Sequence, residues 1–600
     1  MKIDRKFLTD YPPILIVCIA CALFSYVLGP DRYIQRIILL VVIWAAASSS
    51  FNIISGYAGQ IVFGFMMFVG AGAYTSGLLF KFLAISPWLG MWLGAGVAVI
   101  ISLIIGIPTL RLKGAFFAIA TVAFPLITIP ILNHVGVQEV SIPFIGKGAS
   151  SMQFRDMRFY VFIGIVLLGI ILTVVRAIES SCFGYRLKAL KQNETAAEAM
   201  GINTYGAKLL SFCVSAGLAA LVGTLYSFGI LYVMTTEAAF GFLIIIRVLS
   251  ITIVGGMSTV WGPPLAACLL VPLGEWLNSQ FGSRYPGVQD VIYGLALIIV
   301  ILYMPEGIWG KIRRFLSASG TAAVDSRESV AVIRKDDVIK PETVKMSLKL
   351  NPNENSILST ESISKFFGGV CALDQVSLKI PRGKITGVIG PNGSGKTTLF
   401  NVINGFFPPQ SGRIIFEGLD ITNHSPHANC KQGIGRTFQI PQVFSNMTIL
   451  ENIITGAINR SKNLGEAHVA AERIAHDMGL NRRVNEPALG LTLWETKVLE
   501  FSRALATQPA LLLIDEPMAG LNSEEADHLG EMIKGIAASG VTIVVIEHNV
   551  HSLLRIVDYM IGLDDGKRVA EGLPQEVVNN PQIIKAYLGS RWKEEHHAGS

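Results

Sequence analysis

Residues 390–397 read Gly-Pro-Asn-Gly-Ser-Gly-Lys-Thr, a spacing that suits a loop that binds phosphate groups. A short apolar run at 384–390 is typical of a buried strand, and a helix pattern begins near Lys396. In such a strand–loop–helix, backbone N–H groups and the positive end of the helix bind a nucleotide's phosphates. We expect Lys396 to reach the β- and γ-phosphates of ATP and the Thr397 hydroxyl to be a ligand of Mg²⁺. The candidate ATP-binding residues of this loop are Gly390, Asn392, Gly393, Ser394, Gly395, Lys396, Thr397 and Thr398.

Two later strand patterns end in residues that suit ATP hydrolysis. The run 511–517 is apolar and then carries two carboxylates, Asp515 and Glu516. Asp515 at a strand end suits the shell of Mg²⁺, and Glu516 suits orientation or deprotonation of the attacking water. Another apolar strand pattern ends just before His548, which is placed to touch the γ-phosphate. The candidate catalytic residues are therefore Glu516, His548 and Lys396.

Two further residues are candidates for the ATP site, because their places along the chain fit those of the motifs above. Gln439, in the run GRTFQIP, resembles the Q-loop residue that senses Mg²⁺, and Phe367, in KFFGG, resembles the aromatic that stacks on adenine. Taken singly, His548 or Gln439 would more often be an ordinary surface residue, but here the order and spacing of these residues match a family. Residues 357–590 resemble the ATP-binding cassette of branched-chain amino acid ABC transporters, and the closing run NNPQIIKAYLG adds to the match. The resemblance implies an α/β P-loop NTPase domain with the cofactors ATP and Mg²⁺, and with Thr397, Gln439 and Asp515 as metal ligands.

One element departs from the family pattern. Where relatives carry an LSGGQ-like signature, this chain has Leu491, Thr492, Leu493, Trp494 and Glu495. In cassette dimers this segment holds the γ-phosphate bound by the other subunit, and its glycines let the backbone approach. We therefore expect a heterodimeric motor with one robust and one impaired ATP site, the impaired one being the partner's. The alternative is a signature that tolerates substitution because backbone contacts suffice.

The composition divides the chain into unlike halves. Its 600 residues are too many for one core, and 51% apolar with 15% charged residues is too apolar for an ordinary soluble enzyme. The mean hydropathy of +0.51 hides a mostly apolar first half and a second half with a soluble balance. We expect a transmembrane domain at 1–316, a flexible tether at 317–356 and a cassette at 357–600. Lys and Arg beside membrane segments account for much of the net charge of +6, so no nucleic-acid partner is implied.

The N-terminal segment has two patterns that we interpret structurally. Cys18 and Cys21 form a CxxC, but they lie in an apolar helix without a second pair, so packing is favoured over metal or redox chemistry. The first residues precede an apolar stretch without a convincing cleavage site. This predicts a start-anchor helix and not a removed signal.

Apolar stretches of spanning length occur ten times in the first half, which predicts a polytopic α-helical domain. The predicted spans are 12–29, 34–54, 59–80, 88–110, 115–135, 159–178, 208–232, 237–256, 262–281 and 288–305. The third span is rich in glycine, which favours close helix packing. Ten spans place the basic residues on one, cytoplasmic side. These residues are Lys2, Arg5, Lys6, Arg111, Lys113, Arg176, Arg186, Lys188, Lys191, Lys311, Arg313 and Arg314.

The cytoplasmic loop at 176–207 contains a short helix pattern ending at a glycine. Its residues Ala196, Ala197, Glu198, Ala199, Met200 and Gly201 resemble the coupling segment of type I-like ABC importer permeases, which sits in a groove of the ATPase. An ordinary basic loop helix would have a similar composition. The runs at 253–267 and 304–310 also match permeases of branched-chain amino acid transporters, so the resemblance covers most of residues 30–310.

Arg247 departs from the expected permease pattern. A guanidinium near mid-membrane is costly and should face a carboxylate or a wet cavity. Glu275 is the candidate partner in an ion pair, and contact with a substrate carboxylate is the alternative.

Together these patterns predict an ABC importer subunit of a bacterial inner membrane, with permease and cytoplasmic ATPase fused. It would work with a second permease, a second cassette and an extracytoplasmic binding protein, which could dock on the loop at 136–158. Resemblance points to Leu, Ile and Val as substrates; relatives also carry urea, short amides and other small carboxylates. An exporter is disfavoured because exporters have six long spans and lack the coupling segment. A regulator with an inactive cassette is disfavoured by the intact Lys396, Asp515, Glu516 and His548.

Overall fold

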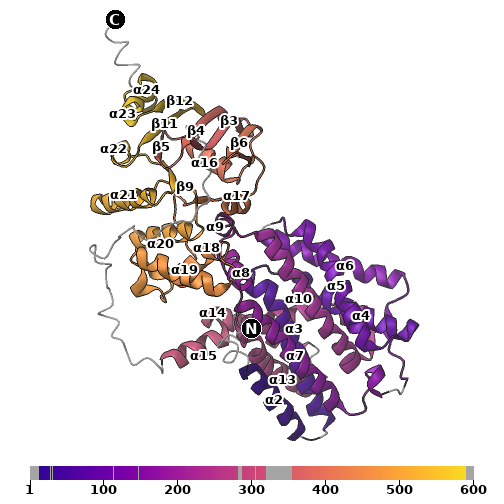
Figure 1. Cartoon of the computed structure of the whole chain (residues 1–600). Coiled ribbons are helices and arrows are strands. Elements are labelled where there is room, and N and C mark those ends of the chain that lie inside the picture. Colours follow the sequence, from indigo (N-terminus) through magenta and orange to yellow (C-terminus); the bar gives the residue numbers. More distant parts are fainter. Residues whose placement is uncertain are drawn as a thin grey trace. The chain divides into compact units, whose positions relative to one another are not determined.

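The chain forms two compact units (Figure 1), one comprising Met1–Lys191 and Tyr205–Ser329, the other Gln192–Thr204 and Val330–Ser600. The computed structural model describes residues 12–27, 29, 31–112, 114–145, 148–281, 287–304, 306–318 and 355–588. The predicted cytoplasmic residues Lys2, Arg5, Lys6 and Lys113 lie outside these ranges, as does most of the predicted tether. The short segment Gln192–Thr204 is flanked in the sequence by residues of the first unit, but it packs within the second unit.

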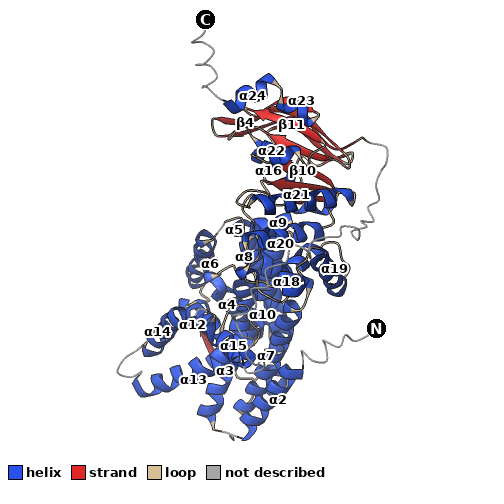
Figure 2. Cartoon of the chain, turned by 90° about the vertical axis from the view of Figure 1, so that its left-hand side faces the viewer, coloured by secondary structure: helices blue, strands red, loops and turns tan. Residues whose placement is uncertain are grey.

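The first unit is built almost entirely of helices (Figure 2). They are α2 (Pro12–Val27), α3 (Arg32–Asn52), α4 (Met66–Leu83), α5 (Pro87–Thr109), α6 (Ala115–His134), α7 (Met157–Glu179), α8 (Cys182–Gln192), α10 (Thr204–Tyr226), α11 (Thr236–Phe240), α12 (Phe242–Gly255), α13 (Gly262–Phe281), α14 (Val288–Tyr303) and α15 (Gly307–Ala318). Two π-helical turns, Ile53–Tyr57 and Ser227–Leu231, extend α3 and α10. A short ribbon pairs β1 (Glu139–Ser141) with β2 (Val233–Thr235).

Each of the ten predicted spans coincides with a helix of this unit, although not all of them are long enough to cross a membrane alone. Among the described residues, seven helices are long and apolar enough, or eight if the bent pair α14 and α15 is one span. Helix α2 has only 16 residues, and α13 is not among the seven. The predicted count of ten is therefore approximate, whereas the polytopic helical architecture is confirmed.

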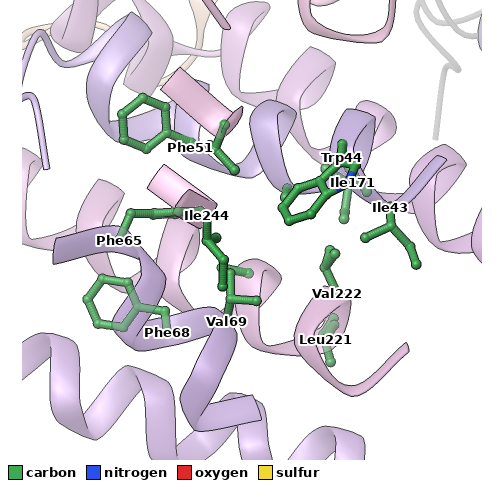
Figure 3. Packing of buried hydrophobic residues seen from close by; sticks show 14 of the residues in the cluster. Ile43, Trp44, Phe51, Phe65, Phe68, Val69, Ile171, Leu221, Val222 and Ile244 are labelled. Atoms are coloured by element: carbon green, nitrogen blue, oxygen red, sulfur yellow. The ribbon is translucent and has the colours of Figure 1, made fainter. Parts of the chain in front are cut away.

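Aromatic and branched aliphatic side chains pack together in the interior of the first unit (Figure 3). Phe65 contacts Phe51 and Phe68 edge to face, with ring centroids 5.1 and 6.2 Å apart. Helices α4 and α10 approach so closely that a Cβ on Gly72 would lie 2.0 Å from the Ala220 carbonyl oxygen. Close backbone approach of this kind stabilises helix pairs in lipid.

We expect Gly72→Ala to destabilise the first unit. The added methyl group would overlap the α10 backbone, and overpacking of this kind costs about 1–3 kcal/mol. Gly96→Ala on α5 is the matched control, because a Cβ there meets nothing within 4 Å. Thermal melting of the detergent-purified chain should show a lower midpoint for the first variant only. Equal midpoints would contradict the packing role of Gly72.

The second unit contains two sheets (Figure 2). The larger has the order β12-β11-β5-β10-β9-β8, and all of its pairings are parallel except that of β12. The smaller is antiparallel, with the order β4-β3-β6-β7. The strands are β3 (Ser356–Phe367), β4 (Val370–Pro381), β5 (Ile385–Ile389), β6 (Ser411–Phe416), β7 (Leu419–Asp420), β8 (Ile434–Arg436), β9 (Leu511–Asp515), β10 (Thr542–Ile546), β11 (Tyr559–Asp564) and β12 (Lys567–Gly572).

Helices accompany both sheets. They are α9 (Glu194–Ala199), α16 (Lys396–Asn404), α17 (Pro426–Gln432), α18 (Ile449–Ala457), α19 (Leu464–Asp477), α20 (Leu493–Ala506), α21 (Ser523–Ala538), α22 (Val550–Leu554), α23 (Pro574–Val578) and α24 (Pro581–Leu588). Strands β5, β9 and β10 are entirely buried and mostly apolar, as parallel strands covered on both faces require. Because β10 lies between β5 and β9, the residues after these three strands meet at one edge of the sheet.

Candidate ATP site

The phosphate loop lies between β5 and α16, as the sequence predicts. Helix α16 begins at Lys396, directly after Gly395, whose φ of 97° is a left-handed conformation that suits glycine. The Lys396 ammonium is buried and donates hydrogen bonds of 2.8 Å to the carbonyl oxygens of Gly390 and Pro391. Burial lowers the pKa of Lys396, opposed by Glu516 and Asp515. The ammonium is thus held over the loop, where phosphate oxygens can replace the two carbonyl oxygens.

Glu516, His548 and Gln439 come from three separate segments and meet at this edge. One carboxylate oxygen of Glu516, Oε1, lies 2.7 Å from His548 Nε2. The other, Oε2, accepts a 2.8 Å hydrogen bond from Gln439 Nε2. Glu516 has a φ of 46°, a costly conformation for a residue with a side chain, and these contacts hold it there. The arrangement suits a carboxylate that accepts a proton from water, with His548 beside it.

Asp515 has an oxygen that no protein group uses. The side chain is buried, and in the part of the chain that the structure describes its Oδ1 has no hydrogen-bond partner. Burial raises the pKa of Asp515, while the neighbouring Arg436, 3.7 Å from Oδ2, opposes the rise. A carboxylate with an unused oxygen in such a setting fits a Mg²⁺ site, because hard cations take oxygen ligands and stabilise the charged form.

Arg436 is a site residue that the sequence prediction missed. Its buried guanidinium lies 5.5 and 5.2 Å from the ring centroids of Phe406 and Phe438 and donates a 2.7 Å hydrogen bond to Asn401 of α16. Burial lowers its pKa to about 10. Arg436 therefore connects the phosphate-loop helix to Asp515. Its position three residues before Gln439 was the only available signal.

Glu500 is the second residue that was missed. It is fully buried on α20 and accepts 3.2 Å hydrogen bonds from the backbone N–H groups of Phe438 and Gln442, on either side of Gln439. Burial raises the pKa of Glu500 to about 7, although Arg503 opposes the rise. Glu500 thus fixes both ends of the segment that carries Gln439.

Tyr587, on α24, is the third site residue that the sequence prediction missed. Its hydroxyl accepts a 2.9 Å hydrogen bond from the Gly390 N–H and donates one of 3.2 Å to the Gly390 carbonyl oxygen. The sequence marked the surrounding run only as a family match. The C-terminal helix therefore holds the first residue of the phosphate loop.

We expect Tyr587→Phe to raise the KM for ATP up to about tenfold with little change in kcat. The variant removes both hydrogen bonds to Gly390, but the carbonyl oxygen keeps its bond from Lys396, so the net loss is that of the N–H contact, about 0.5–1.5 kcal/mol. Tyr559→Phe is the matched control, because among the described residues its hydroxyl has no hydrogen bond. Steady-state ATPase measurements would contradict the role if both variants gave the same KM.

Phe367, the predicted adenine-stacking residue, lies at the turn between β3 and β4. Its ring is 42% exposed, packs edge to face on Phe407 and has the Lys365 ammonium 5.3 Å from its centroid. On the other side of the turn, the Ala372 carbonyl oxygen lies so near Gly395 that a Cβ on this glycine would be 2.5 Å from it. The turn thus lies against the phosphate loop and presents an exposed aromatic face.

Comparisons with known proteins cover both halves. Residues 33–301 match the permease component of the branched-chain amino acid transport system, 373–519 match the ABC transporter family, and 567–592 match the branched-chain amino acid ATP-binding cassette transporter family. The cassette is 36% identical over 250 residues to the probable branched-chain amino acid transport ATP-binding protein LivG of Archaeoglobus fulgidus, covering 40% of this chain and 97% of that protein. The chain belongs to the branched-chain amino acid ABC transporter family. The predicted fusion of permease and cassette is confirmed.

Two further matches have similar coverage. The high-affinity branched-chain amino acid transport ATP-binding protein BraF of Pseudomonas aeruginosa is 34% identical, over 39% of this chain and 98% of that protein. A crystal structure of a nucleotide-free ATP-binding cassette from an ABC transporter is 35% identical and covers 39% of this chain and 99% of that chain, with a TM-score of 0.37. This ABC transporter chain is a membrane protein whose cassette binds and hydrolyses ATP.

The altered signature of this ABC transporter begins α20. Thr492 is the N-cap, and its hydroxyl forms a capping box with Glu495, which in turn pairs with Arg483 at 2.5 Å. Both polar groups of the segment are therefore engaged within the cassette. Leu493 is 45% exposed, so its bulk lies at the surface of the cassette.

The predicted coupling segment packs against cassette residues within the second unit. Asn193 caps α9 by accepting from the Ala196 N–H at 2.9 Å, and its amide also donates to Gln442 Oε1. At the other end, Asn459 donates to the Met200 carbonyl oxygen. Gly201 has a φ of 82°, and a Cβ there would lie 3.1 Å from Cys430 Sγ. The small residues of the segment allow this close packing.

Arg247, the predicted ion-pair partner of Glu275, lies on α12. Its guanidinium lies over the Trp44 ring, 5.7 Å from the centroid. Cation–π contact lowers the cost of a charge away from water. The ion pair and the substrate contact remain untested predictions.

Proposed function

We propose that the chain is the permease and one motor of an ATP-driven importer of branched-chain amino acids. The observation that carries the proposal is the fusion, in one chain, of a branched-chain amino acid permease with a cassette whose candidate catalytic groups lie together at one edge of the sheet. The importer would sit in a bacterial inner membrane, with the cassette in the cytoplasm. Its other parts would be a second permease, a second cassette and an extracytoplasmic binding protein.

Hydrolysis would depend on the groups at the sheet edge. Lys396 would exchange the carbonyl oxygens of Gly390 and Pro391 for phosphate oxygens of ATP. Glu516 would take a proton from the attacking water, and His548 would contact the γ-phosphate. Mg²⁺, when bound, neutralises charge on the phosphates; Thr397, Gln439 and Asp515 would hold it.

Coupling to transport would use the contacts of α9. Asn193 bonds the Gln442 side chain, the Gln442 N–H bonds Glu500, and Glu500 bonds the Phe438 N–H beside Gln439. Gln439 in turn bonds Glu516. These hydrogen bonds form one continuous series from the coupling segment to the proposed general base. A displacement of α9 would therefore reposition the carboxylate.

Uptake by vesicles tests the proposal. Vesicles containing the full transporter and its binding protein, with ATP inside, should accumulate labelled Leu, Ile or Val. Urea, a short amide and a small carboxylate are the comparison substrates. Uptake of urea or an amide in place of Leu would reassign the substrate, and efflux would overturn import.

We also propose that the two ATP sites of the assembled motor are unequal. This chain's signature would complete the partner's site, and its bulky residues would weaken that site. Restoring glycine at Leu493 and Trp494 should change the ATPase rate modestly, by no more than about tenfold, because preorganised contacts would be regained at the weaker site only. ATPase rates of the assembled transporter measure this. A gain of about 10²-fold or more would contradict the unequal-site proposal.

A further inference from the structure

A cavity of about 360 Å³ lies in the first unit where α2 begins, α7 ends and the loop between α12 and α13 meets α15. The proposed function does not use it. Its lining includes Ile14, Arg176, Glu179, Trp261, Trp309 and Arg313.

The chain path places this cavity at the cytoplasmic end of the unit. Helix α7 ends at Glu179 and continues through α8 into Gln192–Thr204, which packs with the ATP-hydrolysing cassette. ATP is a cytoplasmic nucleotide, so the end of α7 that carries Arg176 is the cytoplasmic end. Basic residues at this end obey the positive-inside rule.

Helix α15 forms one wall and has the character of a membrane-surface helix. It bends by 44° from α14, and its sequence combines Trp309 and Phe315 with basic residues, among them Lys311 and Arg313. A helix with apolar and basic faces lies in the interface of the bilayer. Its start is fixed against the α12–α13 loop, because a Cβ on Gly307 would lie 2.4 Å from the Gly256 Cα. This contact brings Trp309 and Trp261 to the same cavity.

The charges at the cavity leave a net positive site. Arg176 is paired with Glu179 at 2.5 Å, whereas Arg313 makes no ion pair among the described residues. Tryptophan prefers the headgroup level of the bilayer, where its ring is apolar and its N–H donates a hydrogen bond. The combination fits a group that is anionic at one end and apolar at the other.

An apolar surface continues from the cavity along α2. Leu15, Ile16 and Leu23 are 63%, 63% and 59% exposed in a helix of the membrane unit. Acyl chains can cover such a surface. We infer that the cavity binds the phosphate headgroup of an anionic phospholipid of the cytoplasmic leaflet, with Arg313 as the anion-binding group and Trp261 and Trp309 beside the glycerol.

Native mass spectrometry of the purified full chain tests the inference, with phosphatidylglycerol and phosphatidylcholine as probes. The wild type should retain phosphatidylglycerol more tightly than phosphatidylcholine. Arg313→Gln should weaken phosphatidylglycerol binding about fivefold, the effect of losing one basic group near an anionic headgroup. Lys311→Gln is the matched control, because it removes the same charge from the same helix but does not line the cavity.

A second variant and a soluble competitor separate the alternatives. Trp309→Leu should also weaken phosphatidylglycerol binding while Arg313 remains. If Arg313→Gln and Lys311→Gln weakened phosphatidylglycerol binding equally, the lipid would be attracted only by the overall positive charge of α15, and the proposed site would be overturned. Displacement of the lipid by soluble glycerol 1-phosphate at equal concentration would identify a site for a free phosphate compound, and equal retention of phosphatidylcholine would exclude an anion site.

Discussion

Glu516→Gln should lower the ATPase rate of the transporter about 10²–10⁴-fold, the range that general-base catalysis contributes. An amide keeps the size of the side chain but cannot accept the proton of the attacking water. Glu516 is held between His548 and Gln439 at 2.7 and 2.8 Å, so its position is set before ATP binds. ATP binding should be unaffected, because the phosphate loop and Lys396 are unchanged. Single-turnover hydrolysis and nucleotide binding measure the two effects separately.

The control for this variant is Glu531→Gln. Glu531 is an exposed residue of α21 that pairs with Lys534, so the same chemical change is made away from the sheet edge. Its ATPase rate should remain within about twofold of the wild type, since exposed ion pairs contribute little. If Glu516→Gln retained most of the rate, another group would have to be the base.

Glu500→Ala is expected to have the second largest effect. It leaves the N–H groups of Phe438 and Gln442 without their acceptor and removes the carboxylate that faces the buried Arg503. A buried charge left uncompensated costs about 3–5 kcal/mol. The thermal midpoint of the cassette should fall by about 10 °C, and leucine uptake per ATP hydrolysed should fall because Gln439 is no longer held.

Glu500→Gln separates positioning from stability. It keeps an oxygen at the position of Oε1, which accepts from both N–H groups, but removes the charge that faces Arg503, so uptake per ATP should lie between wild type and Glu500→Ala. Gln also cannot titrate. The folded pKa of Glu500, about 7, lies above its ordinary value of 4.5, so the protonated form favours folding. That stabilisation is complete below pH 4.5 and is lost as the pH rises to about 7. The thermal midpoint of the wild type should therefore fall relative to that of Glu500→Gln as the pH rises through this window. If the difference between the two midpoints were the same at both ends of the window, the shifted pKa would be contradicted.

Residues that act through their neighbours in the chain were predictable from the sequence. The phosphate loop needs glycines, a lysine and a helix start within eight residues, and the apolar helices need only a run of suitable length. Asp515 and His548 end apolar strands, so their position at one sheet edge followed from strand patterns. The fusion of permease and cassette was likewise evident because each half carries its own local patterns.

The supporting residues were decided by tertiary structure. Glu500, Arg436 and Tyr587 act on groups far away in the sequence or across a strand, and each has a type that also occurs at ordinary surface positions. Their role comes from burial, which makes one hydrogen bond to a backbone group or one charge contact energetically important. Burial depends on which elements pack together, and local patterns do not contain that information. The sequence alone therefore predicted the candidate catalytic groups and the membrane half, whereas only the folded chain revealed the residues that hold those groups in place.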